Sequence, residues 1–110
     1  MVSLSYLTFD PSQYSALVAS IPAGAKNPLD VRVLAEELRR LCKRYDLNMA
    51  LIWSQIMHET AGFTSDVWSQ RKNPAGIKNA SGDAFMRYDN GVDAARAMVS
   101  HVTAYVKTSN

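Results

Sequence analysis

The sequence predicts a single, mainly helical α+β domain. Its length of 110 residues fits one domain, and its shares of apolar and charged residues are those of an ordinary globular protein. Several segments repeat apolar residues at steps of three and four, the period of an amphipathic helix. Before the last of these segments, a glycine-containing turn separates two short runs, which is typical of a β-hairpin.

Two helices are expected before residue 46. A short one starts at Asp10-Pro11-Ser12 and ends near Val18, because proline is tolerated in a first helical turn. A longer one starts at Asp30, a residue type that caps helix N-termini. Its apolar stripe is formed by Val31, Leu34, Leu38, Leu41 and Tyr45. The charged residues between 36 and 44 fall largely off this stripe, so we expect them on a solvated face.

Two further helices and the hairpin follow. The third helix runs from Asn48 to about Ala61, where Gly62 is a natural stop. Residues 76–78 and 84–88 flank the turn 79–83 and form the expected hairpin. The last helix starts near Asn90. Its stripe consists of Val92, Ala95, Val99, Val102 and Val106.

Glu59 is the most informative residue. By spacing it shares a face of the third helix with Ile52, Gln55 and Ile56, and that face is expected to be buried. Burial disfavours an ionised carboxylate, and the negative end of the helix dipole acts in the same direction. A glutamic acid that keeps its proton near neutral pH suits general acid catalysis at a glycosidic oxygen. The alternative is a Glu that turns to solvent or pairs with a nearby cation.

Other function classes find little support. The formal charge of +2 is small, and the basic cluster within residues 39–44 has no groove-reading motif beside it, so no nucleic acid is expected. His58-Glu59 lacks the second histidine of a zinc-protease motif, because Gly62 stands there. We therefore expect no metal and no cofactor. Residues 1–9 carry no Sec-type signal, and no segment is apolar enough to cross a membrane.

Three blocks resemble the glucosaminidase family of peptidoglycan hydrolases. The stretch 56–65, Ile-Met-His-Glu-Thr-Ala-Gly-Phe-Thr-Ser, is similar to the end of that family's catalytic helix. Residues 72–78, Lys-Asn-Pro-Ala-Gly-Ile-Lys, resemble its Asn-rich Gly-Ile-Lys segment. Residues 85–89, Phe-Met-Arg-Tyr-Asp, resemble its Phe-x-x-Tyr-Asp segment. The blocks occur in family order, and the similarity covers about half of the chain, from about Ala50 to Val106.

The resemblance implies a lysozyme-like fold and cleavage next to N-acetylglucosamine. It implies that Glu59 is the catalytic acid and Tyr88 an active-site tyrosine, and Asp83 is the best candidate for a second acid. Tyr88 could instead pack on the last helix, and Asp83 could serve only the turn. Trp68 could stack on a sugar or anchor its loop. The remaining candidate substrate-binding residues are Gln55, Asn73, Gly76 and Lys78.

The sequence departs from the family because the region that often carries a second acid is short here. A hydrolase, a lytic transglycosylase and a muramidase of the same fold therefore stay open, as does a glycan-binding domain without activity. The Asn-Pro-Ala-Gly-Ile variant resembles phage lysins. Its expected partner is bacterial peptidoglycan, reached through a holin or a virion, and the expected state is a monomer. Residues 1–110 form one domain, which could belong to a longer lysin.

Overall fold

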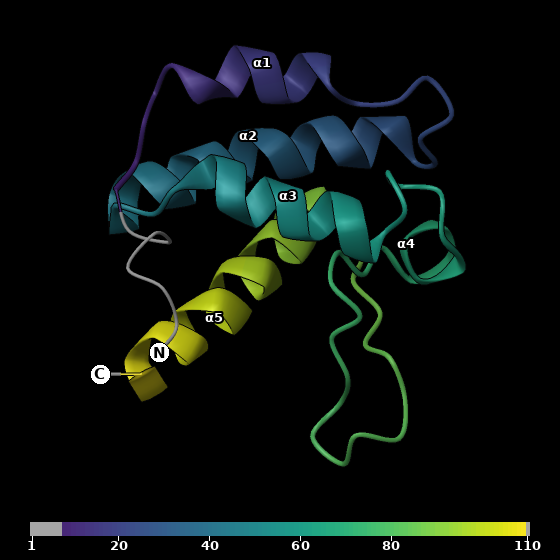
Figure 1. The fold of residues 1–110 in the computed structure, drawn as a ribbon. Coiled ribbons are helices and arrows are strands. Elements are labelled where there is room, and N and C mark those ends of the chain that lie inside the picture. The colour runs from purple at the N-terminus through teal and green to yellow at the C-terminus, as the bar shows by residue number, and fades with distance from the viewer. Residues whose placement is uncertain (1–7, 110) are drawn as a thin grey trace.

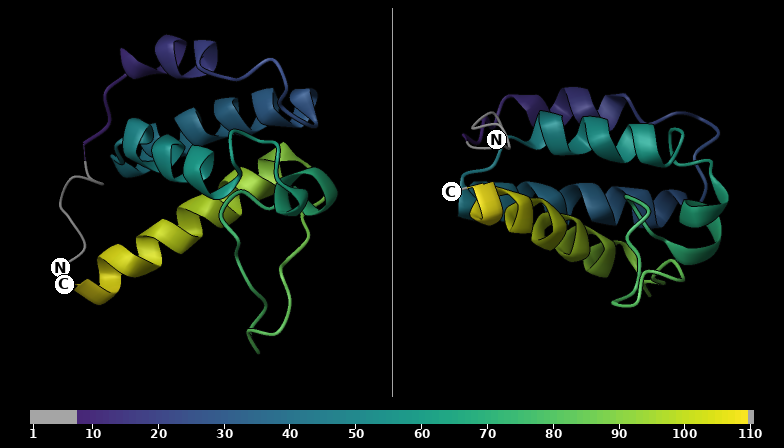
Figure 2. Two further views of the ribbon diagram at one scale, coloured as in Figure 1. Left: turned by 45° about the vertical axis from the view of Figure 1, so that its right-hand side comes forward. Right: turned by 60° about the horizontal axis from the view of Figure 1, so that its bottom comes forward.

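The computed structural model describes residues 8–109, and side chains as far as residue 104. The described part is mainly helical, as predicted, and the helices form two layers (Figures 1 and 2), α1 and α3 in one and α2 and α5 in the other. No helix in residues 8–109 is both long enough and apolar enough to cross a membrane. The helices are α1 (Gln13–Ala19), α2 (Pro28–Tyr45), α3 (Met49–Glu59), α4 (Asp66–Arg71) and α5 (Gly91–Ser109).

The core rests on the packing of α2 against α5. The predicted stripe of α2 is buried except for Tyr45, which is 51% exposed at the helix end. In α5, Val92 is half-buried and the side chain of Val106 lies outside the described part. The buried residues of α5 are Ala94, Ala95, Met98, Val99 and Val102.

The two helices come into close backbone contact at Gly91. A Cβ at this position would lie 2.2 Å from the backbone oxygen of Asp30, so only glycine fits. The N–H of Gly91 donates to Asp30 Oδ1 at 3.1 Å. Asp30, expected to cap its own helix, instead serves the first turn of α5, and α2 begins two residues earlier at Pro28.

Glu37 contradicts the expected solvated face of α2. Its side chain is only 10% exposed and forms ion pairs with Arg40 at 2.6 Å and Arg96 at 3.0 Å. The hydrogen bonds from Arg40, followed by those from Arg96, hold the pKa of the Glu37 carboxyl below its usual value, although burial opposes them. Periodicity within one helix could not reveal this pair, because Arg96 lies on α5.

The buried face of α3 differs from the predicted one. Met49, Trp53 and two isoleucines are buried, and the rings of Trp53 and Phe63 lie 5.5 Å apart. Gln55 and Glu59 are exposed. The face is therefore centred on the side of Met49 and Trp53, and the prediction that Glu59 is buried is wrong. The Asn48 cap is confirmed by a bond from the N–H of Leu51 at 3.3 Å.

The predicted β-hairpin does not form strands. Its arms meet in one antiparallel bridge, between Lys78 and Phe85. Residues 80–87 are all exposed, so neither face of a sheet would be buried there, and an isolated two-stranded ribbon is marginal in water. The loop instead projects from the helical body as a long finger (Figure 1). A short helix that the sequence did not predict, α4, precedes it.

Candidate functional site

The site is centred on the turn that ends α3. Glu59 is the last residue of the helix, and its side chain is exposed. Ala61, Gly62 and Phe63 then follow with φ angles of 51°, 67° and 63°. Left-handed backbone costs a non-glycine residue about 1–2 kcal/mol, and such strain is concentrated at functional sites. The turn holds because the ring of Phe63 is fully buried beyond it.

The hydroxyl of Thr60 stabilises this turn. It donates to the backbone oxygen of Ile56 at 2.6 Å and accepts from the N–H of Phe63 at 2.9 Å. Thr60 is buried, so both bonds are shielded from water. The position of Glu59 is thus fixed on one side by helix α3 and on the other by a rigid turn.

Glu59, Gly76 and Phe85 come together in space. A Cβ added to Gly76 would lie 3.8 Å from Glu59 Oε2 and 3.7 Å from Cε1 of Phe85. The φ of +62° favours glycine at this position. The absence of a side chain at residue 76 leaves a small space between an exposed carboxylate and an aromatic ring. The Nζ of Lys78 lies 5.6 Å from the centroid of the same ring.

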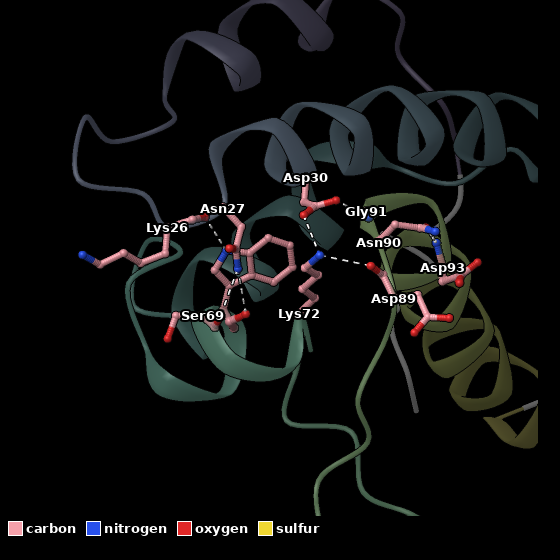
Figure 3. Close-up of polar contacts among 10 residues, drawn as sticks. Lys26, Asn27, Asp30, Ser69, Lys72, Asp89, Asn90, Gly91 and Asp93 are labelled. Atoms are coloured by element: carbon pink, nitrogen blue, oxygen red, sulfur yellow. Dashed lines mark hydrogen bonds and ion pairs between the residues drawn. The ribbon is translucent and has the colours of Figure 1, made fainter.

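One lysine fixes both ends of the loop that carries Gly76 and Phe85. The Nζ of Lys72 lies 2.9 Å from Asp30 Oδ2 and donates to the backbone oxygen of Asp89 at 3.0 Å (Figure 3). Lys72 precedes the loop, and Asp89 follows it. The base of the loop is therefore tied to the N-terminal end of α2, where Gly91 also contacts Asp30.

Asn73 organises the inside of the loop. Its amide donates to the backbone oxygens of Ile77 and Met86 at 2.8 and 2.9 Å, and its Oδ1 accepts from Ala75 and Ile77. The side chain is fully buried. Its hydrogen-bonding capacity is used within the loop, so the expectation that Asn73 binds substrate is wrong for this structure. Asn73 positions Gly76 instead.

Trp68 is likewise a structural residue. It is fully buried, its Nε1 donates to the backbone oxygen of Lys26 at 2.7 Å, and its ring lies 5.1 Å from that of Phe63. Asn27 donates to the backbone oxygens of Trp68 and Ser69, which fixes α4 against the start of α2 (Figure 3). An indole with no exposed face cannot stack on a sugar. The stacking expectation is corrected, and the anchoring alternative describes Trp68.

Tyr88 and Gln55 lie near the edges of the site. Tyr88 is half-buried against the core, and burial raises the pKa of its hydroxyl. Its backbone N–H donates to the oxygen of Arg71 at 2.8 Å, at the end of α4. Gln55 is exposed on α3, one turn before Glu59.

Asp83 lies in the exposed turn of the loop. Its Oδ1 accepts from Asn79 at 2.8 Å and from Ser81 at 2.9 Å, and these two bonds lower the pKa of the carboxyl, Asn79 the more. Within the described residues, the Asp83 side chain makes its hydrogen bonds inside this turn. The alternative role, in which Asp83 serves the turn, therefore accounts for its contacts.

Phe85 is the site residue that sequence reasoning missed. It stands in one of the family-like blocks, but the sequence alone indicates no role for its side chain. It is 39% exposed, although its ring faces Gly76 and Lys78. A single aromatic in a loop has no period from which its exposure could be read, so only the structure places it beside Glu59.

Comparison with known proteins gives no relative for this chain. No family model matches it, and neither the curated proteins nor the solved structures contain a significant match. Among residues 8–109, no group of three or more His, Cys, Asp or Glu side chains gathers in a way that could hold a metal ion. The geometry around Glu59 therefore has to carry the functional argument.

Proposed function

We propose that this domain cleaves the glycan strands of bacterial peptidoglycan next to N-acetylglucosamine, with Glu59 as the general acid. The observation that carries the proposal is the convergence of the Glu59 carboxylate and the Phe85 ring at Gly76, where the missing side chain leaves room for about a methyl group between them. An exposed aromatic ring suits the apolar face of a pyranose, and the Glu59 carboxyl group, in its protonated form, supplies a proton. The three family-like blocks of the sequence contribute one residue each to this space.

The reaction begins with proton transfer from Glu59 to the glycosidic oxygen. The bond from that oxygen to the anomeric carbon breaks, and an oxocarbenium-like transition state follows. A glycan over Phe85 excludes water from the carboxylate, which favours the neutral acid that this step needs. The burial that the sequence suggested for Glu59 is then supplied by the substrate rather than by the core.

Water then adds to the anomeric carbon and loses a proton, and reprotonation of the Glu59 carboxylate completes the cycle. A carboxylate that activates water in an inverting enzyme lies about 6.5–9.5 Å from the acid, and a nucleophile in a retaining enzyme lies at about 5–5.5 Å. Asp83 is a poor platform for either, because it sits in an exposed turn and is held by Asn79 and Ser81. We therefore expect Asp83→Asn to cost much less activity than Glu59→Gln. Tyr88, half-buried where the loop meets the core, is the proposed second polar group of the site.

The test is Glu59→Gln, assayed by turbidity loss of purified cell walls and by mass spectrometry of the released fragments. Loss of a general acid lowers the rate by about 10²–10⁴-fold. Glu59 is exposed, so the free energy of unfolding should change by less than about 0.5 kcal/mol. Asp66→Asn, which removes another exposed carboxylate, is the matched control and should keep the native rate.

The products decide the remaining alternatives. Reducing ends at N-acetylglucosamine support the proposal, whereas 1,6-anhydro-muramic ends would make the domain a lytic transglycosylase. A correctly folded Glu59→Gln protein with native activity would end the proposed mechanism. Native protein that binds walls and releases no fragments would instead make this a glycan-binding domain.

A further inference from the structure

A strip of basic side chains lies along the seam between α2 and α5. It lines two adjoining hollows of about 440 and 490 Å³ that share Arg40. The residues that line the two hollows include five of the twelve Lys and Arg residues and two of the ten Asp and Glu residues, so their formal charge of +3 exceeds the +2 of the whole chain. The five cations, called the basic strip below, are Arg39, Arg40, Lys43, Arg44 and Arg96. The two carboxylates are Glu36 and Glu37.

Glu37 holds two of these arginines in place from beneath. It accepts from Nε and one terminal nitrogen of Arg40, at 2.9 and 2.6 Å, and from Nε of Arg96 at 3.0 Å. Both arginine side chains are more than half exposed, whereas the Glu37 side chain is nearly covered. Fixed arginines lose less side-chain freedom when they bind an anion, which favours binding.

The larger hollow has the chemistry of an anion site. Arg40, Arg44 and Arg96 line it together with Ser100 and Thr103, and no carboxylate is among its described lining residues. The Thr103 hydroxyl donates to the backbone oxygens of Val99 and Ser100, so the arginines are the donors that the hollow offers an anion. Its apolar lining residues are Leu41, Tyr45 and Val99. Arginine presents a planar fork of donors that matches phosphate oxygens.

The aromatic ring of the hollow is already engaged. The guanidinium of Arg44 lies 5.4 Å from the centroid of the Tyr45 ring. The cation therefore occupies one face of the ring and leaves less of the ring for a nucleobase to stack on.

We propose that the basic strip binds a phosphodiester polymer of the bacterial envelope, a chain in which small polyols join successive phosphates. Three arginines around one hollow carry more positive charge than a ligand with a single carboxylate could neutralise. The second hollow extends the positive charge along α2. A polymer that carries anions at intervals fits this arrangement. The envelope as its source rests on the proposed function, whereas the strip itself is independent of Glu59, because α3 lies in the other layer (Figure 2).

The consequence is attachment at two points. A wall that presents both glycan and phosphodiester chains would engage the Glu59 site and the basic strip of the same molecule. Each contact then raises the effective concentration of the other. The strip would keep the enzyme on the wall between cleavage events.

The experiment measures binding of the full chain to deacylated poly(glycerol phosphate) by calorimetry. The salt concentration is varied from about 50 to about 300 mM, because the screening of charges changes strongly over this range. Two variants remove two charges each from the strip, Arg44→Gln/Arg96→Gln and Lys43→Gln/Arg44→Gln. The second leaves both ion partners of Glu37 in place and so guards against misfolding. The control, Lys26→Gln/Arg32→Gln, removes two exposed charges elsewhere.

The native chain is expected to bind, and both strip variants to bind at least about tenfold more weakly at low salt. The slope of log K against log salt should fall by up to about one for each lost phosphate contact. The control should bind within about twofold of native and keep its slope, because its charges lie outside the strip.

Equal losses in the strip variants and the control would overturn the proposal, because only net charge would then matter. Tighter binding of single-stranded DNA or of hyaluronate than of poly(glycerol phosphate) would also overturn it. Glu59→Gln should bind the polymer as the native chain does. If the native chain binds the polymer but does not cleave walls, only the proposed function is contradicted. If it cleaves walls but does not bind the polymer, only the proposal for the basic strip is contradicted.

Discussion

Replacement of Gly76 by alanine tests whether the space between Glu59 and Phe85 holds the substrate. The new methyl would meet Glu59 Oε2 at 3.8 Å and Phe85 Cε1 at 3.7 Å, which are ordinary contacts, so no clash follows. The φ of +62° remains, and it costs an alanine about 1–2 kcal/mol. The melting temperature should therefore fall, by roughly 3–8 °C for each kcal/mol of stability that is lost.

Activity should fall further than stability. A sugar that rests in this space is displaced by a methyl group by the order of 1 Å, and such a shift costs about 10²-fold in rate. Gly82→Ala is the matched control, because its φ is +76° and nothing lies within 4 Å of its added Cβ. Both variants are compared by wall turbidity per folded molecule, with the folded fraction measured by circular dichroism.

The two variants should lose similar stability, and only Gly76→Ala should lose lysis. A Gly76→Ala protein that matches Gly82→Ala in rate would refute the reasoning, because the space at residue 76 would then have no part in catalysis. An equal loss of lysis in both variants would instead make the mobility of the whole loop the controlling property.

Three further predictions concern the frame and the titratable groups. Gly91→Ala places a methyl 2.2 Å from the backbone oxygen of Asp30 and should destabilise by about 3 kcal/mol or more in urea denaturation, whereas Gly24→Ala, with open space around it, should be neutral or slightly stabilising. The pKa of Glu37 is lowered from 4.5 in the fold, so its stabilisation is present above that pH and is lost as pH falls through the lower folded value. The stability difference between native and Glu37→Gln should thus shrink in melting curves taken below pH 4.5. Burial raises the pKa of Cys42 to about 12, so the thiol should react slowly with a disulfide reagent at pH 8 and rapidly once the chain is unfolded.

The sequence predicts the long helices well because their apolar residues carry a clear period. Leu34, Leu38 and Leu41 of α2 are buried as expected. Such a stripe reports only the face that meets the core, and its centre can be misplaced by one position. That error put Glu59 inside when it lies at the exposed border of α3. The six residues of α4 are too few to display a period, so this helix could not be found.

The parts of the site that depend on contacts between distant segments could not be predicted. Trp68 and Phe85 are both aromatic residues outside the predicted helices, yet one is fully buried and the other 39% exposed. What separates them is the backbone oxygen of Lys26, which accepts from Trp68 and fixes it inside. Neither the composition nor the spacing of residues could have predicted this hydrogen bond to Lys26.

The lysine that fixes the base of the loop also determines where the chain can vary. Because Lys72 joins Asp30 and Asp89, the two ends of the loop stay in place whatever the length of the chain between them. Doubling the length of a flexible loop costs only about 0.6 kcal/mol in closure entropy. Residues 80–84 are therefore a natural insertion point, where a longer segment could be accommodated without disturbing helix α3, which carries Glu59.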